Sequence, residues 1–238
     1  MIYGVMRILA TDTTSSFISI ALLEDETLLA ETHFQADRKH TELLLPHTDE
    51  LLKKMGMALG DVDLLAVSVG PGSFAGVRIG VSTWKGLAAG ADLPLLGVSR
   101  LESILHAIPP VVEVVCPMLD ARMGEVYSAV FTFQNGKYVE NKSPIAITAA
   151  EQARLVPPHC AFVGDGATLY EEDIKLVHPG AVVLPESFST PRATYTGIEA
   201  FRRSQAGQSS DPVSVMPIYL RKSQAEEMRD KKNTVVTP

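Results

Sequence analysis

The stretch LLAVSVGPGSFAGVRIG, residues 64–80, joins a buried strand to a helix through a glycine-rich turn. Leu64 to Val69 is a continuous apolar run rich in Leu, Val and Ala, which is typical of a strand covered on both faces. Ser73 is a suitable N-cap for a helix that extends to about Ala89. A strand, a tight turn and a helix in this order form the unit of α/β folds, so the stretch predicts a layered α/β protein.

Three strand-like runs joined by short turns precede this unit. They are predicted at Arg7 to Asp12, Phe17 to Leu23 and Thr27 to Phe34. A helical pattern follows from about Asp37 to Met55. Pro46 lies inside this pattern, and it either kinks the helix or begins a second one.

The second half of the chain repeats this order of elements. We expect strands at Val111 to Leu119, Glu125 to Phe133, Lys137 to Ala146 and Ala161 to Val163. We expect helices at Thr148 to Leu155, before the last of these strands, and around Tyr195 to Ala206, after it. The repetition predicts a duplicated α/β unit, with an N-terminal lobe over residues 1–108 and a smaller C-terminal lobe over residues 109–222. Residues 223–238 are charged and then polar, and we expect them to fray.

Composition narrows the class of protein. Hydrophobic residues make up 46% and charged residues 21% of the 238 residues, which is an ordinary globular balance. The net charge of -7 and the lack of a basic stripe argue against binding of a nucleic acid by this chain alone. Cys116 and Cys160 are too few for a disulfide framework, and we interpret both as structural. Because no segment resembles a signal peptide or a membrane span, we expect a cytoplasmic protein without a membrane partner.

Two turns are candidates for phosphate binding. Asp12 and Thr13 stand at the end of the first strand, where a carboxylate and a hydroxyl can hold a metal-bound phosphate. The same residue types also form ordinary turns, which is the interpretation that the sequence favours here. Gly70, Gly72 and Ser73 lead into a helix N-terminus, which can bind an anion or simply pack closely. The turn has no Gly-Lys-Ser/Thr, so it is not a Walker loop.

The helix after this turn is rich in small residues, with Gly76, Gly80 and Gly86 among them. Glycine inside a helix costs about 1 kcal/mol relative to alanine, so close packing must offset it. The packing partner is either another part of this chain or a partner subunit. Trp84 on the same helix is likewise either a core residue or an interface anchor.

Several kinds of catalytic site are excluded by spacing. His40 and His47 are seven residues apart, which separates them by ~10 Å along a helix, too far to ligate one zinc ion. The sequence has no His-Glu-x-x-His, and no serine has glycine at both the second position before it and the second position after it. Metalloprotease and serine-hydrolase chemistry therefore have no support.

A set of short motifs, in order along nearly the whole chain, resembles the TsaB (YeaZ) family, historically grouped with the M22 glycoprotease-like proteins. The motifs lie at residues 10–14, 40–46, 70–80, 120–122 with 125–127, 163–166, and 217–221. This resemblance implies the fold shared by acetate kinase, sugar kinases, Hsp70 and actin, with two duplicated lobes and a cleft between them.

The resemblance also implies a function. The family is the non-catalytic, actin-like paralogue of TsaD, and it supports threonylcarbamoyl modification of the adenosine next to the anticodon of ANN-decoding tRNAs. TsaD carries a His-x-x-x-His metal motif, and Arg100 and Ile104 stand where those histidines would be. Arginine and isoleucine are not metal ligands, so the chain resembles a pseudo-enzyme that binds TsaD, with the ATPase TsaE as a further partner.

For the isolated chain the resemblance implies a homodimer, no tightly bound cofactor, no catalytic residue and no metal ligand. ATP or ADP with magnesium is expected only in the complex, and the turns described above would be vestigial phosphate sites. The expected partner-binding residues come from two helices: His40, Leu44, His47, Leu51, Met55, Gly80, Trp84 and Leu87. The competing hypotheses are a nucleotide-binding phosphotransferase of the same fold and, as a distant third, an M22-type peptidase.

Overall fold

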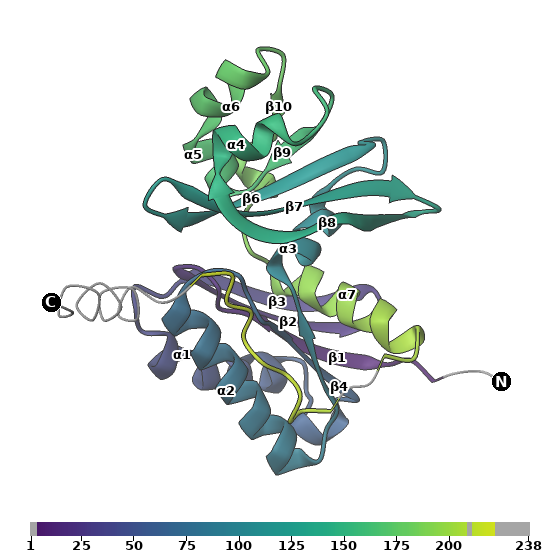
Figure 1. Ribbon diagram of the computed structural model, residues 1–238. Coiled ribbons are helices and arrows are strands. Elements are labelled where there is room, and N and C mark those ends of the chain that lie inside the picture. Colours follow the sequence, from purple (N-terminus) through teal and green to yellow (C-terminus); the bar gives the residue numbers. More distant parts are fainter. Residues whose placement is uncertain (1–3, 209–210, 222–238) are drawn as a thin grey trace, which may run out of the picture.

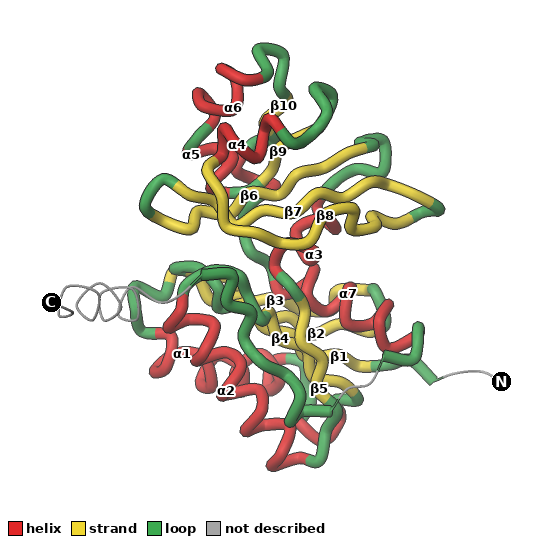
Figure 2. Tube along the Cα trace, in the orientation of Figure 1, coloured by secondary structure: helices red, strands yellow, loops and turns green. Residues whose placement is uncertain are grey.

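The computed structural model describes residues 4–208 and 211–221, which form two lobes, each built on a mixed five-stranded sheet (Figure 1). Figure 2 shows helices beside each sheet and a short helical connection between the lobes. That connection consists of α3 (Arg100–Ser103) and the 3-10 helix η2 (Ile104–Ala107).

The first sheet has the strand order β3-β2-β1-β4-β5. Its strands are β1 (Arg7–Asp12), β2 (Phe17–Glu24), β3 (Thr27–Gln35), β4 (Leu64–Ser68) and β5 (Leu95–Val98). β1 pairs antiparallel with β2 but parallel with β4, because a tight turn joins the first two strands and a helical crossover precedes the fourth. The accompanying helices are α1 (His40–Lys54), α2 (Phe74–Ala91), α7 (Ala193–Gln205) and the 3-10 helix η1 (Leu59–Asp61).

The second sheet has the order β10-β9-β6-β7-β8. Its strands are β6 (Val114–Arg122), β7 (Glu125–Gln134), β8 (Lys137–Thr148), β9 (Ala161–Val163) and β10 (Val182–Val183), and its helices are α4 (Ala149–Arg154), α5 (Asp165–Leu169), α6 (Glu171–Val177) and η3 (Glu186–Phe188). Counted from the first strand of each lobe, the two sheets have the same order. The predicted duplicated, two-lobed actin-like fold is therefore confirmed.

The last helix departs from the predicted division into lobes. α7 was expected in the C-terminal lobe, residues 109–222, but it packs against β1, β2 and β4 of the first sheet (Figure 1). Gly197 permits this approach, since a Cβ there would lie 2.5 Å from a methyl carbon of Leu23. The chain thus returns to the first lobe after completing the second. The tail expected to fray, residues 223–238, lies outside the described residues.

α1 and α2 cover one face of the first sheet and share an apolar core with it. α7 packs on the opposite face, in a second apolar cluster. α1 continues through Pro46 as a single helix and begins at His40, three residues later than expected. Ser73 is the N-cap of α2, as predicted, because its hydroxyl accepts a hydrogen bond from the Gly76 amide at 3.3 Å. Trp84 is fully buried, and its indole N–H donates to the Leu9 carbonyl oxygen at 3.2 Å. It is a core residue.

The glycines of α2 pack against the turn between β1 and β2, not against another helix. A Cβ on Gly76 would lie 2.0 Å from the Thr13 carbonyl oxygen, and one on Gly80 would lie 2.3 Å from the Thr13 hydroxyl. By contrast, a Cβ on Gly86 would meet nothing within 4 Å. The sequence left open whether these small residues pack inside the chain or on a partner; for Gly76 and Gly80 the contact is internal, with the Thr13 turn.

This contrast predicts opposite effects of one chemical change on stability. Gly76→Ala should lower the free energy of unfolding by roughly 2–3 kcal/mol, because the new methyl group forces the helix away from Thr13. Gly86→Ala should raise it by up to about 1 kcal/mol, because alanine is the better helix former and the position is open. Urea denaturation followed by circular dichroism measures both values. Equal effects of the two substitutions would contradict the packing described here.

Candidate functional site

A cleft of about 1100 Å³ lies between the two lobes. The first lobe lines it with the β1–β2 turn and the first turn of α2, and the second lobe lines it with the ends of β6 and the start of α5. Its lining residues are Thr14, Ser15, Ser16, Asp37, Arg38, His40, Gly72, Ser73, Phe74, Ala75, Gly76, Ile79, Arg100, Asp120, Ala121, Arg122, Tyr127, Asp165 and Arg221. Polar residues of both lobes line the cleft, and it is the candidate site.

Asp12 and Thr13, two of the predicted phosphate-binding residues, do not line this cleft. One carboxylate oxygen of Asp12 accepts hydrogen bonds from the Thr14 amide at 2.8 Å and the Thr14 hydroxyl at 2.7 Å. The Thr13 hydroxyl donates to the Gly76 carbonyl oxygen at 2.8 Å. Both side chains are buried, so they shape the turn from behind it, and the neighbouring Ser15 and Ser16 face the cleft. The turn interpretation is the one that this geometry supports.

Of the other predicted phosphate-binding residues, Gly72 and Ser73 line the cleft, and Gly70 precedes them outside its lining. Gly72 lies against the β1–β2 turn, because a Cβ there would be 2.3 Å from the Thr14 carbonyl oxygen. The Ser73 amide donates to that same oxygen at 2.7 Å. Gly70 has φ +94°, a conformation that favours glycine. The loop thereby places the N-terminus of α2, with its partial positive charge, at the cleft.

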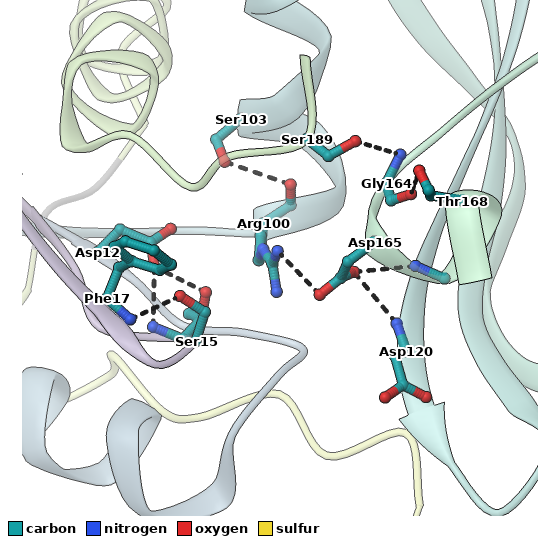
Figure 3. A network of polar contacts seen from close by, with 12 residues as sticks. Asp12, Ser15, Phe17, Arg100, Ser103, Asp120, Gly164, Asp165, Thr168 and Ser189 are labelled. Carbon is teal, nitrogen blue, oxygen red and sulfur yellow. Dashed lines mark hydrogen bonds and ion pairs between the residues drawn. The ribbon is translucent and has the colours of Figure 1, made fainter. Parts of the chain in front are cut away.

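Arg100 joins the two sides of the cleft (Figure 3). Its amide donates to the Gly70 carbonyl oxygen at 2.8 Å, and one guanidinium nitrogen lies 3.5 Å from a carboxylate oxygen of Asp165. The other oxygen of Asp165 accepts from the amides of Asp120 and Gly166 at 3.2 and 3.1 Å. Ile104 is buried in the second lobe's core.

The segment 211–221 runs along the first lobe and reaches the second. The Lys85 ammonium donates to the Val215 carbonyl oxygen at 3.0 Å, and the Ile218 amide donates to Val69 at 2.8 Å. Tyr219 stacks on Phe74 with ring centroids 5.1 Å apart. Arg221 then donates to the Ala121 carbonyl oxygen at 3.4 Å and to the Glu125 carboxylate at 3.3 Å, both in the second lobe. This segment is a second link between the lobes, besides α3.

An ionic cluster fixes the connection between the lobes to α7. Arg203 lies 2.6 Å from a carboxylate oxygen of Glu102 and 3.0 Å from one of Glu199, and His106 lies 2.9 Å from the other oxygen of Glu199. Burial raises the pKa of Glu102 above its ordinary value, although Arg203 acts in the opposite direction. Burial also raises the pKa of Glu199, but the hydrogen bonds from His106 and Arg203 outweigh it, and the net pKa is lowered.

Five of the predicted partner-binding residues lie inside the chain. Leu44, Leu51 and Trp84 belong to the core of the first lobe, and Gly80 packs on Thr13. His40 is buried too, and its Nε2–H contacts the carbonyl oxygen of Ser15 at 3.0 Å. These residues cannot contact a partner while the lobe is folded, because the apolar stripe expected to face a partner instead faces the sheet. This is a correction of the predicted surface.

The remaining three predicted residues, His47, Met55 and Leu87, are half-buried at the edges of the helices. Next to them, the outer surface of α1 and α2 exposes Leu45 and Ser82, which the sequence did not single out, and Gly86, which it did. Leu45 is 48% exposed, and Ser82 and Gly86 are exposed on α2. Helical periodicity placed the apolar stripe correctly, but only the packing on the sheet shows which side of each helix remains outside.

No local pattern in the sequence indicates a role in a site for Arg100, Asp165 or Arg221. The motifs at residues 120–122, 163–166 and 217–221 stand out only through the family resemblance. In the structure these three motifs converge on the cleft. The signal was therefore present, but nothing in the spacing along the chain indicated that the segments meet.

The duplicated topology and the interlobe cleft define a protein of the actin-like class. A family model described as "TsaD: tRNA N6-adenosine threonylcarbamoyltransferase" matches residues 33–167. The "tRNA threonylcarbamoyladenosine biosynthesis protein TsaB" of Haemophilus influenzae is 43% identical over 229 residues, which cover 91% of this chain and 94% of that protein. The Escherichia coli protein of the same name is 44% identical over 129 residues, and that match spans 53% of this chain and 55% of that protein.

A solved structure agrees with these matches. The Pseudomonas aeruginosa structure described as "an uncharacterized protein with similarity to peptidase YEAZ" has a TM-score of 0.78 and 30% identity, and the match covers 91% of this chain and all of that one. The chain belongs to the TsaB (YeaZ) family. Within the described residues, no helix has the length and apolar character needed to cross a membrane.

The buried position of Asp12 predicts a structural effect for its substitution. Asp12→Ala should lower the free energy of unfolding by about 1–3 kcal/mol, because the Thr14 amide and hydroxyl lose their buried acceptor. Asp12→Asn keeps an acceptor oxygen and should cost less. Chemical denaturation of both variants checks this order. A wild-type unfolding curve for Asp12→Ala would show that the carboxylate does not hold the turn.

Proposed function

We propose that this chain is a non-catalytic partner subunit in the biosynthesis of threonylcarbamoyladenosine on tRNA, and that it acts by binding a TsaD-like paralogue. Its relatives at 43% and 44% identity carry names from that pathway. Half of the chain also matches the TsaD family model, so a duplicated ancestor accounts for both subunits. Related folds often pair through equivalent surfaces, which supports a complex between the two paralogues.

The observation that carries this proposal is the outer face of α1 and α2. The two helices lie side by side on the first sheet, away from the second lobe (Figure 1). On this face Leu45 is half exposed, and Ser82, Gly86 and Gly90 are small exposed residues of one helix. Small residues allow a partner helix to approach closely. Glycine destabilises a helix, and at Gly86 and Gly90 no contact within the described chain offsets that cost.

The cleft offers little support for catalysis. A magnesium-bound nucleotide would need an accessible carboxylate, but Asp12 is 1% exposed and does not line the cleft. Arg100 and Ile104 replace the histidines of the TsaD motif, and Ile104 lies in an apolar core. We therefore propose that ATP or ADP with magnesium binds only in the complex, through residues of the TsaD-like paralogue.

The proposal extends to two further associations. A TsaE-like ATPase would join the complex of the two paralogues, and the chain alone would form a homodimer through the same outer face of α1 and α2. Direct binding of tRNA by the isolated chain is not part of the proposal, because the net charge of -7 opposes it.

Arginine substitutions on the proposed face and away from it form a matched test of the surface. Leu45→Arg and Gly86→Arg should each weaken binding to the TsaD-like paralogue by about tenfold or more, because a charged side chain is placed in a closely packed contact. Leu176→Arg on α6, where the leucine is 82% exposed, should leave binding unchanged. Size-exclusion chromatography with light scattering detects the complex of each variant, and a binding titration gives its affinity. Modification activity is assayed in the reconstituted mixture.

Equal behaviour of the three variants would contradict the proposed surface. Absence of any complex between the wild-type proteins at micromolar concentration would contradict the scaffold function itself. Tight ATP binding by the isolated chain, with turnover, would then favour the phosphotransferase alternative.

A further inference from the structure

The apolar cores of the two lobes are separate. In residues 4–208 and 211–221, none of the four buried apolar clusters combines strands of the first sheet with strands of the second. Close apolar packing makes each lobe rigid, but that packing does not continue from one sheet to the other. The angle between the lobes therefore depends on the polar contacts that join them.

The connection between the lobes, α3 with η2, has two different sides. Its apolar side chains, Leu101, Ile104 and Leu105, lie in the core of the second lobe. Glu102 and His106 instead contact α7, which packs on the first sheet (Figure 1). Apolar packing thus joins α3 and η2 to the second lobe, whereas ion pairs join them to α7. We expect the connection to move with the second lobe.

Arg203 of α7 is the centre of these charged contacts. Its guanidinium lies 2.6 Å from a carboxylate oxygen of Glu102 and 3.0 Å from one of Glu199. It also donates to the Gly97 carbonyl oxygen at 3.1 Å, and Glu199 lies 2.9 Å from His106. The four charged side chains are only 11–32% exposed, so water and salt weaken their attraction less than that of a fully exposed pair. Such a chain of charges can hold two bodies together without an apolar core between them.

The neighbouring Arg202 has a similar contact that stays within one lobe. Its guanidinium donates to the two carboxylate oxygens of Glu26 at 2.7 and 3.1 Å. Glu26 stands in the turn between β2 and β3, so this pair joins α7 to the sheet on which it already packs. Arg203, by contrast, joins α7 to Glu102 in the connection that is fixed to the second lobe. Two adjacent arginines with the same chemistry thus differ in whether their contact spans the lobes.

We propose that Arg203 is a latch between the lobes. Its contact with Glu102 holds the connection against α7 and thereby fixes the angle between the lobes. When the contact breaks, the second lobe rotates together with α3 and η2 as one body, and the width of the interlobe cleft changes. Opening the latch separates ion pairs without exposing an apolar core, so its free-energy cost is small and falls as the salt concentration rises. The proposal concerns the isolated chain and does not depend on the scaffold function.

Two spin labels on the full chain measure the angle between the lobes. Lys54→Cys on α1 and Glu172→Cys on α6 place one label on each lobe at an exposed position, and both native cysteines are buried. Double electron–electron resonance should give one narrow distance distribution for this labelled parent. Adding Arg203→Met should broaden the distribution roughly twofold, because the lobes then sample a range of angles. Adding Arg202→Met removes the same charge from the next residue and should leave the distribution unchanged.

Salt provides a second measurement that needs no change in the latch itself. About 1 M sodium chloride shortens the Debye length to ~3 Å, so it should broaden the parent's distribution and add little to that of Arg203→Met. If Arg203→Met does not fold, as judged by circular dichroism, Glu102→Gln on the other side of the latch should give the same broadening.

Three results would overturn the proposal. The first is a narrow distribution both in Arg203→Met and in the parent at high salt. The second is equal broadening by Arg203→Met and Arg202→Met, because the second arginine has no contact across the lobes in its printed pair with Glu26. The third is a broad distribution of the parent at low salt, because the latch would then not fix the angle.

Discussion

The close contact between Thr13 and the glycines of α2 is the constraint on which the first lobe depends. The helix can lie this near the β1–β2 turn only because Gly76 and Gly80 have no side chain, since a Cβ at either position would overlap Thr13. The Thr13 hydroxyl then bonds to the Gly76 carbonyl oxygen. This contact sets where α2 begins, and with it one wall of the interlobe cleft. In this chain the residues of the β1–β2 turn therefore hold a helix in place.

Two connections hold the second lobe against the first. In one, Arg100 of α3 faces Asp165, and Glu102 of the same helix is tied to α7 through Arg203. In the other, the segment 211–221 follows the first lobe and ends at Glu125 of the second. Because α7 and this segment come after the second lobe in the chain, the first lobe is complete only when almost the entire chain has folded.

α2 contributes to two separate surfaces. Its N-terminus lines the cleft, whereas its outer face, with Ser82 and Gly86, is turned away from the sheet.

The sequence by itself determined the order of the elements, the duplication of the α/β unit, the Ser73 cap and the burial of both cysteines. These features follow from local rules, because hydrophobic periodicity, capping and turn chemistry act over a few residues. Only the tertiary structure decided that α7 belongs to the first lobe, that Trp84 is a core residue, and that Arg100 and Asp165 meet across a cleft. A helix pattern states which residues are apolar but not what they pack against, and residues 65 positions apart come together only through the packing of both sheets.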